Sequence, residues 1–192
     1  MITRSTPKTI RFAHYSWNET VTTVRAILDN PFSRESFGRL LNLPRFGVLL
    51  PGRIFRSGEP TRRVHFRHVE RLGVRTLLCL RDEGPSDDVA AFASSKGLSL
   101  RVFALGKPSQ EDASAIIGAA QTALDHARQP ALIYCDGGRH RAGMVSGIVR
   151  HLQGWSLGSI IEEYLQFAQP SPYADNIAAI LRCVLRHAET PE

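Results

Sequence analysis

The chain has 192 residues, 43% of them hydrophobic and 22% charged, which suits a single globular domain with a core of its own. Its net charge of +6 is carried almost wholly by arginine, since Lys8, Lys96 and Lys107 are the only lysines. No apolar run is long enough to span a bilayer, the N-terminus lacks the pattern of a signal peptide, and no nucleic-acid recognition motif accompanies the basic charge. We therefore expect a cytoplasmic protein without a membrane or nucleic-acid partner.

The cysteines argue against a metal-binding protein and against a protein held by disulfides. Cys79, Cys135 and Cys183 lack the spacing of a metal site, so we expect no metal, and they do not form an even disulfide framework. A reducing compartment is the natural interpretation.

In chain order, an N-terminal extension over residues 1–45 precedes the main domain, and a helix is expected in it over Trp17–Leu28. The expected strands are Val48–Leu50, Ile54–Arg56, Thr76–Leu80, Leu98–Leu105 and Ala131–Tyr134. The expected helices are Thr61–Arg71, Ser86–Ser95, Ser109–Arg128, Arg141–Leu152, Ser156–Ala168 and Ala174–His187. Because strands alternate with helices, the predicted fold class is α/β, with a central, mostly parallel sheet flanked by helices.

The stretch from Tyr134 to Gly143 joins an expected strand to an expected helix and has the sequence YCDGGRHRAG. Such a turn directs several backbone N–H groups and the positive end of a helix at one point, which favours an anion there. Gly137 and Gly138 allow the backbone to approach that anion closely. The stretch is therefore predicted to be an anion-binding loop.

Two side chains of this loop, a cysteine and an arginine, are suited to react with or bind a phosphoryl group. Cys135 lies where the helix N-terminus and the basic residues Arg139, His140 and Arg141 favour a nucleophilic thiolate. Arg141 can lay its planar guanidinium across two oxygens of a phosphoryl group. Asp136 adds a negative charge to this otherwise basic loop and is expected to repel highly anionic substrates if it faces the pocket.

The Cys-x5-Arg loop between a strand and a helix resembles the signature of the cysteine-dependent protein tyrosine and dual-specificity phosphatases. Further segments, in order and at similar spacing, resemble the plant and fungal type of atypical dual-specificity phosphatases. They are Phe46–Gly58, Leu72–Arg81, His140–Gly143, Trp155–Leu157 and Glu162–Ala168. The resemblance implies a dual-specificity phosphatase-like domain over residues 46–190.

The loop and the resemblance together predict hydrolysis of phosphate monoesters through a phosphocysteine, without a metal or organic cofactor. Cys135 is then the nucleophile and Arg141 the clamp. Phosphate binding is assigned to Asp136, Gly137, Gly138, Arg139, His140 and Lys107. The predicted substrate is a phosphorylated protein of the phosphotyrosine or dual-specificity kind. The resemblance also implies an alternative, an inositol polyphosphate or pyrophosphate.

In this family an aspartate in the loop before the long helix that precedes the nucleophile commonly acts as the general acid. That loop is Leu105–Asp112 here, with Asp112 as the first candidate and Glu111 as the second. Ser109 and Asp112 also have the spacing of a helix-capping pair, so Asp112 has a second interpretation as a cap. Without an acid, a phosphoanhydride with a good leaving group is favoured, since general acid catalysis contributes ~10²–10⁴ in rate.

Two positions depart from the family pattern. Tyr134 stands where a histidine commonly precedes the cysteine, and Ala142 stands where a serine or threonine commonly follows the arginine. The missing hydroxyl bears on breakdown of the phosphoenzyme, which leaves a catalytically weak phosphate-binding interaction protein as a further alternative. Cys79, on a strand expected beside that of Cys135, is interpreted either as core or as a redox partner of Cys135.

Overall fold

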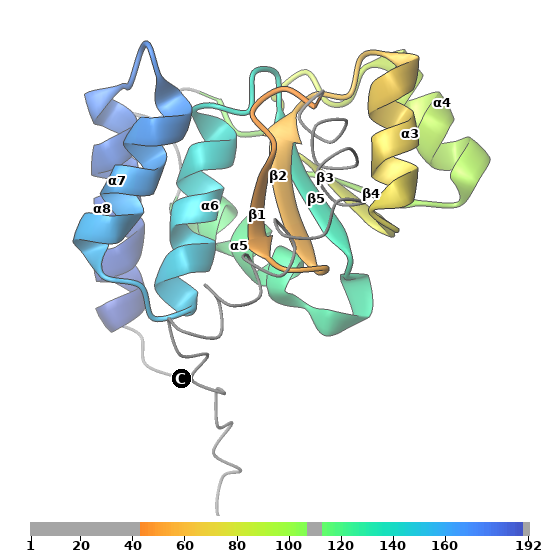
Figure 1. Cartoon of the computed structure of the whole chain (residues 1–192). Helices are drawn as coiled ribbons and strands as arrows, with labels where there is room; N and C mark the ends of the chain where they lie inside the picture. Colours follow the sequence, from red (N-terminus) through yellow and green to blue (C-terminus); the bar gives the residue numbers. More distant parts are fainter. Residues whose placement is uncertain (1–42, 107–112, 190–192) are drawn as a thin grey trace, which may run out of the picture. The chain divides into compact units, whose positions relative to one another are not determined.

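A five-stranded sheet forms the centre of the computed structural model, which describes residues 43–106 and 113–189 (Figure 1). The strand order is β1-β2-β5-β3-β4. The strands are β1 (Gly47–Leu50), β2 (Ile54–Gly58), β3 (Thr76–Cys79), β4 (Ser99–Val102) and β5 (Ala131–Cys135). Strands β2 to β5 pair in parallel, and β1 is antiparallel to β2. The predicted mostly parallel sheet is confirmed, whereas the helix predicted over Trp17–Leu28 lies outside the described residues.

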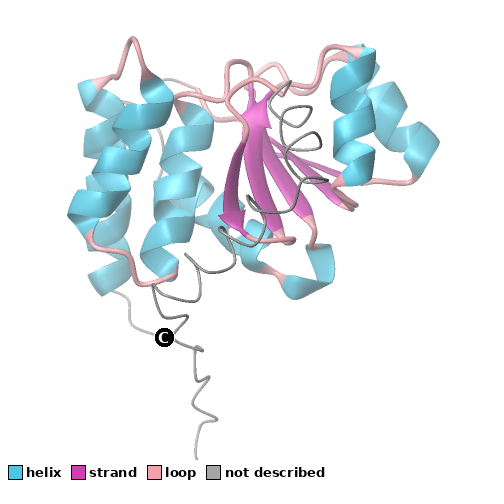
Figure 2. Cartoon of the chain, viewed as in Figure 1, coloured by secondary structure: helices cyan, strands magenta, loops and turns pink. Residues whose placement is uncertain are grey.

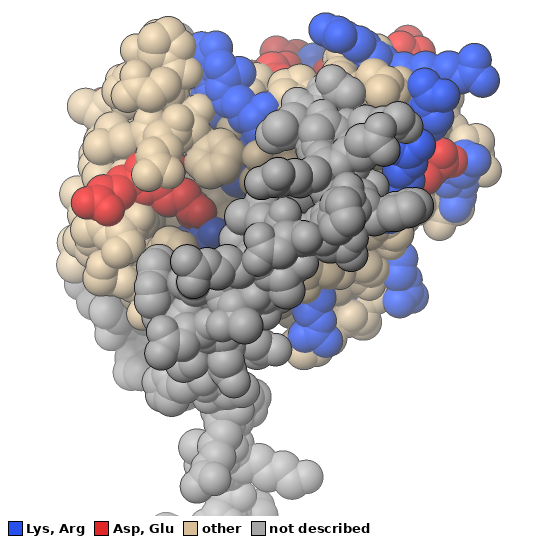
Figure 3. All heavy atoms as spheres, viewed as in Figure 1, with Lys and Arg blue, Asp and Glu red and all other residues tan. Residues whose placement is uncertain are grey.

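Helices cover both faces of this sheet (Figure 2). They are α3 (Arg63–Arg71), α4 (Asp87–Lys96), α5 (Ala113–Leu124), α6 (Arg141–Leu152), α7 (Leu157–Ala168) and α8 (Ala174–Glu189). Helices α5 to α8 pack with one another on one face, and α3 and α4 lie on the other. The face in Figure 3 shows basic side chains gathered on the α3 side and acidic ones on the α7 side.

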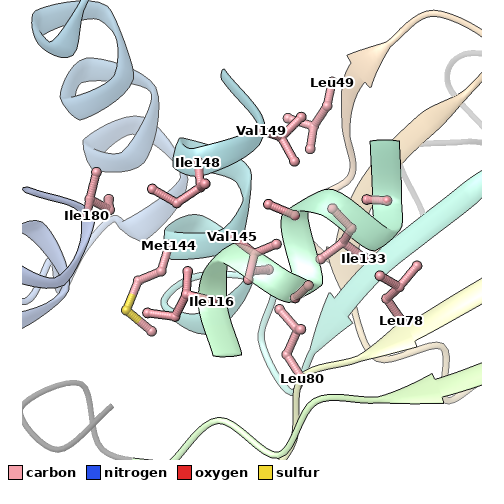
Figure 4. Packing of buried hydrophobic residues seen from close by; sticks show 14 of the residues in the cluster. Leu49, Leu78, Leu80, Ile116, Ile133, Met144, Val145, Ile148, Val149 and Ile180 are labelled. Atoms are coloured by element: carbon pink, nitrogen blue, oxygen red, sulfur yellow. The ribbon is translucent and has the colours of Figure 1, made fainter. Parts of the chain in front are cut away.

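Strand β5 explains why the core has two parts. All its residues are buried, as expected of a central parallel strand, and successive side chains alternate between the faces. Ala131, Ile133 and Cys135 pack into the larger cluster with α5 to α8, whereas Leu132 and Tyr134 pack toward α3 and α4. Figure 4 shows the larger cluster, in which Met144 of α6 lies near Ile116 of α5 and Ile148 lies near Ile180 of α8.

The predicted helix over Arg141–Leu152 is confirmed, and some other predicted bounds are wrong. The strand expected over Leu98–Leu105 is confined to Ser99–Val102. The helix expected to reach Arg128 ends at Leu124, because Asp125 accepts a hydrogen bond from Ala127 N at 3.0 Å and starts a separate 3-10 turn. The helix expected from Thr61 begins at Arg63, since the N-cap residue Arg62 has an extended backbone with φ −126° and ψ 152°.

Candidate active site

The loop 136–140 connects the end of β5 to the start of α6, and it rests directly on β2. Gly138 has φ +68°, and a Cβ atom there would lie 2.4 Å from Gly58 N and 2.6 Å from the carbonyl carbon of Ser57. Glycine is therefore required at position 138 both for its conformation and for the contact. On the β2 side, Glu59 N donates to Asp136 O at 3.1 Å. The loop is thus held by β2 while Cys135, 3% exposed, opens the loop at the end of β5.

Arg56 of β2 supports the loop from beneath. Its side chain is fully buried, Nη2 donates to Gly138 O at 2.6 Å, and the guanidinium lies 4.0 Å from the centre of the Phe167 ring. Nε and Nη1 are buried without a hydrogen-bond partner in the part of the chain that the structure describes. Burial lowers the pKa of Arg56 to about 10, so the side chain stays charged at neutral pH. A fixed positive charge therefore lies below the loop.

A pocket of about 240 Å³ opens above the loop. Residues 135–141 other than Gly138 line it, together with Arg45. The structure thus brings together six of the predicted site residues, and Gly138 shapes the backbone between them. Lys107 and Asp112, and the second acid candidate Glu111, lie outside the described residues.

Arg45 was missed by the sequence interpretation, which placed it in the N-terminal extension. It lines the pocket, and Nη1 donates to Gly137 O at 3.3 Å. The segment around it is docked on β2, since Leu43 is buried and Gly58 N donates to Pro44 O at 2.6 Å. No local pattern around Arg45 signals this position, because the contact depends on how the segment before β1 packs on the loop.

Two arginines beside the pocket are paired with carboxylates. Arg141 Nη1 donates to Asp82 Oδ1 at 2.7 Å and to Leu105 O at 3.2 Å, and Nη2 contacts Asp136 Oδ2. Arg81, which follows β3, binds Asp136 at 2.7 Å and both carboxylate oxygens of Glu59. Asp136 therefore bridges Arg81 and Arg141, so part of its negative charge is compensated.

Asp82 is well placed to hold Arg141 and poorly suited to donate a proton. A hydrogen bond from its own backbone amide, another with Glu83 and the contact with Arg141 together lower the pKa of the Asp82 carboxyl below its ordinary value. The group is therefore ionised at neutral pH. A general acid works best with a pKa near the working pH, which disfavours Asp82 in that role.

His140 is held by the segment between α7 and α8. Its Nε2 donates to Ser171 O at 2.8 Å, and its ring stacks on Tyr173 with 4.1 Å between ring centres. This segment thus holds His140, which itself lines the pocket. The ring position of His140 is set by contacts outside the loop.

Tyr134 and Cys79 lie on the other face of the sheet from Cys135. They are paired in register on β5 and β3, and both belong to the core cluster under α3 and α4. Burial, followed by the neighbouring Cys79 thiol, raises the pKa of Tyr134, and burial raises the pKa of Cys79. Because side chains on opposite faces of a sheet point apart, a disulfide between Cys79 and Cys135 would need the backbone to move. The placement favours the core interpretation of Cys79.

No group of three or more potential metal ligands gathers among residues 43–106 and 113–189. In the same ranges, no helix has the length and apolar character needed to cross a membrane.

The comparisons with known proteins agree with this geometry. The model of the tyrosine phosphatase family matches residues 40–180. The chain belongs to the tyrosine phosphatase family. Among its relatives, OCA1 of Yarrowia lipolytica is 38% identical over 120 residues, which cover 60% of this chain and 47% of OCA1. Other OCA1 relatives give similar shares, so the chain spans about half the length of these family members.

Two further relatives carry more specific names. Inositol diphosphatase DSP4 of Arabidopsis thaliana is 31% identical over 144 residues, covering 73% of this chain and 72% of DSP4. The catalytic domain of the PP-IP phosphatase SIW14 from S. cerevisiae has a TM-score of 0.67 and 28% identity, covering 77% of this chain and 93% of that domain. These fungal and plant relatives confirm the predicted resemblance to the plant and fungal type.

Proposed function

We propose that this protein is a cysteine-dependent phosphatase that hydrolyses phosphate monoesters of the phosphotyrosine or dual-specificity kind. The observation that carries the proposal is the position of Cys135 in a basic pocket at the N-terminus of α6, with Arg141 beside it. The positive end of the α6 dipole and the Arg141 guanidinium lie beside Cys135, and the loop amides would complete the cradle for a transferred phosphoryl group.

The reaction takes place in two displacements. The Cys135 thiolate attacks phosphorus, a P–S bond forms, and the bond to the leaving oxygen breaks, with that oxygen taking up a proton. Water then attacks the phosphocysteine, which releases inorganic phosphate and restores the thiolate. In both steps Arg141 must exchange the carboxylates of Asp82 and Asp136 for phosphoryl oxygens. Assignment of the proton donor to Asp112 stays a prediction.

An inositol polyphosphate or pyrophosphate phosphatase is the second candidate. It is supported by the names of DSP4 and SIW14 and by the charge of the pocket. A poor proton donor at Asp82, whose carboxyl pKa is lowered, is compatible with this candidate, because a phosphoanhydride leaves as phosphate and needs less help from an acid. The expected cytoplasmic location and the expected absence of nucleic-acid and membrane partners stay predictions.

Hydrolysis of para-nitrophenyl phosphate by the purified chain tests the proposal. The wild type should release nitrophenol, and Cys135→Ser should reduce the rate to background because a hydroxyl is a much weaker nucleophile. Cys79→Ala is the matched control, since it removes a buried thiol from the neighbouring strand on the other face of the sheet. No hydrolysis by the folded wild type would favour the phosphate-binding interaction protein, for which Ala142 already gives a reason.

A further inference from the structure

Helix α3, on the opposite face of the sheet from α6, has a row of arginines on its solvent-facing side. Arg63, Arg67 and Arg71 are exposed and follow one another at intervals of four residues. Residues at this interval lie on the same side of a helix, so the row falls within an arc of about 80° and extends over about 12 Å. Figure 3 shows basic side chains gathered on the α3 side of the molecule. We propose that this row, the α3 arginine face, binds an acidic helix of a partner protein.

The charge of the α3 arginine face is not compensated within the chain. None of its three arginines has a carboxylate partner among the described residues. The acidic residue of α3, Glu70, is bound instead by Lys96 of α4 at 2.6 Å. Three guanidinium groups, each able to hold a carboxylate by two hydrogen bonds, are therefore open to another molecule.

This arrangement is unfavourable for the helix itself. Arg63 with Arg67, and Arg67 with Arg71, are like charges four residues apart, which destabilise a helix. Arg62 and Arg63 stand at the positive end of the helix dipole, and the first turn holds no acidic residue. The positive charge also reaches the buried side of α3, where the pKa of His68 is lowered by burial and then by Arg71. A local pattern that costs stability without a compensating contact in the fold is expected at a surface used for binding.

The chemistry of the face fits a protein partner better than a nucleic acid or a membrane. Among the described residues, the exposed large hydrophobic side chains all lie outside α3. They are Val48, Val102, Trp155, Leu157, Tyr173 and Leu185. Helix α3 therefore offers neither an exposed aromatic ring on which a base could stack nor a large apolar side chain to enter a bilayer.

The spacing of the arginines indicates a helix as the occupant. Four residues of a helix rise by about 6 Å, so glutamates at every fourth position of a partner helix present carboxylates at the same repeat. The probe is a fluorescently labelled helical peptide with this pattern. Its counterpart has the same composition in scrambled order, so that the two differ in spacing and not in charge. Fluorescence anisotropy measures the affinity of the full chain for each peptide.

Two triple variants separate the face from the net charge of the protein. The test variant, Arg63→Gln/Arg67→Gln/Arg71→Gln, removes three charges and keeps good helix formers. The control variant replaces by glutamine three exposed arginines outside α3 that also lack a carboxylate partner among the described residues. They are Arg53, Arg75 and Arg101. Melting temperatures verify that both variants are folded, and the test variant should melt at the wild-type temperature or slightly above it, because like-charge pairs are removed.

We expect the wild type to bind the spaced peptide more tightly than the scrambled one, and the test variant to bind the spaced peptide about tenfold more weakly. The control variant should stay within about twofold of the wild type. Equal affinity for the two peptides, or equal weakening in the two variants, would overturn the proposal.

Two other occupants are tested on the same proteins. A single-stranded RNA oligonucleotide, or vesicles of phosphatidylcholine and phosphatidylserine, would overturn the acidic helix if either bound more tightly than the spaced peptide and lost binding in the test variant. Neither set of arginines lines the pocket around Cys135, so all three proteins should hydrolyse para-nitrophenyl phosphate alike. The peptide affinities do not depend on that reaction, so a failure of catalysis contradicts the proposed function alone.

Discussion

The two ends of helix α6 each have a buried arginine. Arg150 belongs to the C-terminal end of the helix, and Arg56 of β2 lies beneath the N-terminal end. Both side chains are buried. The Arg150 guanidinium lies 4.0 Å from the centre of the Trp155 ring, and the Arg56 guanidinium lies 4.0 Å from the centre of the Phe167 ring. Arg150 is fully paired, with bonds to Glu163, Gln153 and the carbonyl oxygens of Val48 and Leu49. Arg56 has two buried nitrogens without a partner in the described parts of the chain.

The two ends of α6 also differ in how their charged residues match the helix dipole. Arg150 and His151 in the last turn suit the negative end of the helix dipole. At the other end, Arg141 begins the helix after Arg139 and His140, and the first turn holds no acidic residue. Positive charge at the positive end of a dipole costs stability, which indicates an end built to bind an anion. The C-terminal end of α6 therefore stabilises the fold, and the N-terminal end is suited to bind an anion in the site.

Arg141→Lys should have the largest effect of the substitutions that sharpen this comparison. Lysine keeps the charge and loses the planar fork that matches two phosphoryl oxygens. We expect kcat for para-nitrophenyl phosphate to fall by about 10²–10³, the usual loss for a transition-state donor. Near wild-type kcat would show that Arg141 does not contact the phosphoryl group.

Arg56→Met should lower kcat/KM by about 10², because the Gly138 carbonyl loses its donor and the loop is displaced. Arg56→Lys should restore part of this loss. Arg150→Met is the matched control: it removes a buried arginine from the opposite end of α6 and should lower the melting temperature while the folded fraction keeps its kcat/KM. Equal kinetic losses in Arg56→Met and Arg150→Met would remove the distinction between the two ends.

Gly138→Ala should destabilise the protein by about 2 kcal/mol or more, since alanine is strained at φ +68° and its Cβ would meet Gly58 N at 2.4 Å. Denaturant unfolding measures this change. Gly158→Ala is the control, because no atom lies within 4 Å of a Cβ there and Gly158 is part of α7. Its stability should be unchanged or slightly raised, and a similar loss in both variants would contradict the close contact.

Asp136→Asn should have the smallest effect and the opposite sign. It removes a half-exposed carboxylate that competes with the phosphoryl group for Arg141. Partly exposed ion pairs contribute about 0.2–1 kcal/mol, so KM should fall by a factor of about 1.4 to 5. A raised KM would mean that Asp136 holds Arg141 in position rather than competing for it.

The sequence predicted the strand, the loop and the helix around Cys135 because their pattern is local. Cys135 and Arg141 lie within one strand-to-helix turn, and the bounds of the helix over Arg141–Leu152 follow from its apolar pattern. Arg56 lies within the segment Phe46–Gly58 that resembles the phosphatases, yet its place under Gly138 depends on the parallel pairing of β2 with β5. Arg45 was missed for a similar reason, since its pocket contact joins residues far apart in the chain. Neither contact leaves a periodic or spacing signal.

Trapping the phosphoenzyme tests the central claim most directly. The purified chain is acid-quenched during turnover of para-nitrophenyl phosphate, and its intact mass and peptides are measured, with Cys135→Ser in parallel. The account predicts the added mass of one phosphoryl group, mapped to Cys135 in the wild type and absent from the variant. Hydrolysis that persists in Cys135→Ser, or a phosphoryl group mapped to another residue, would contradict it.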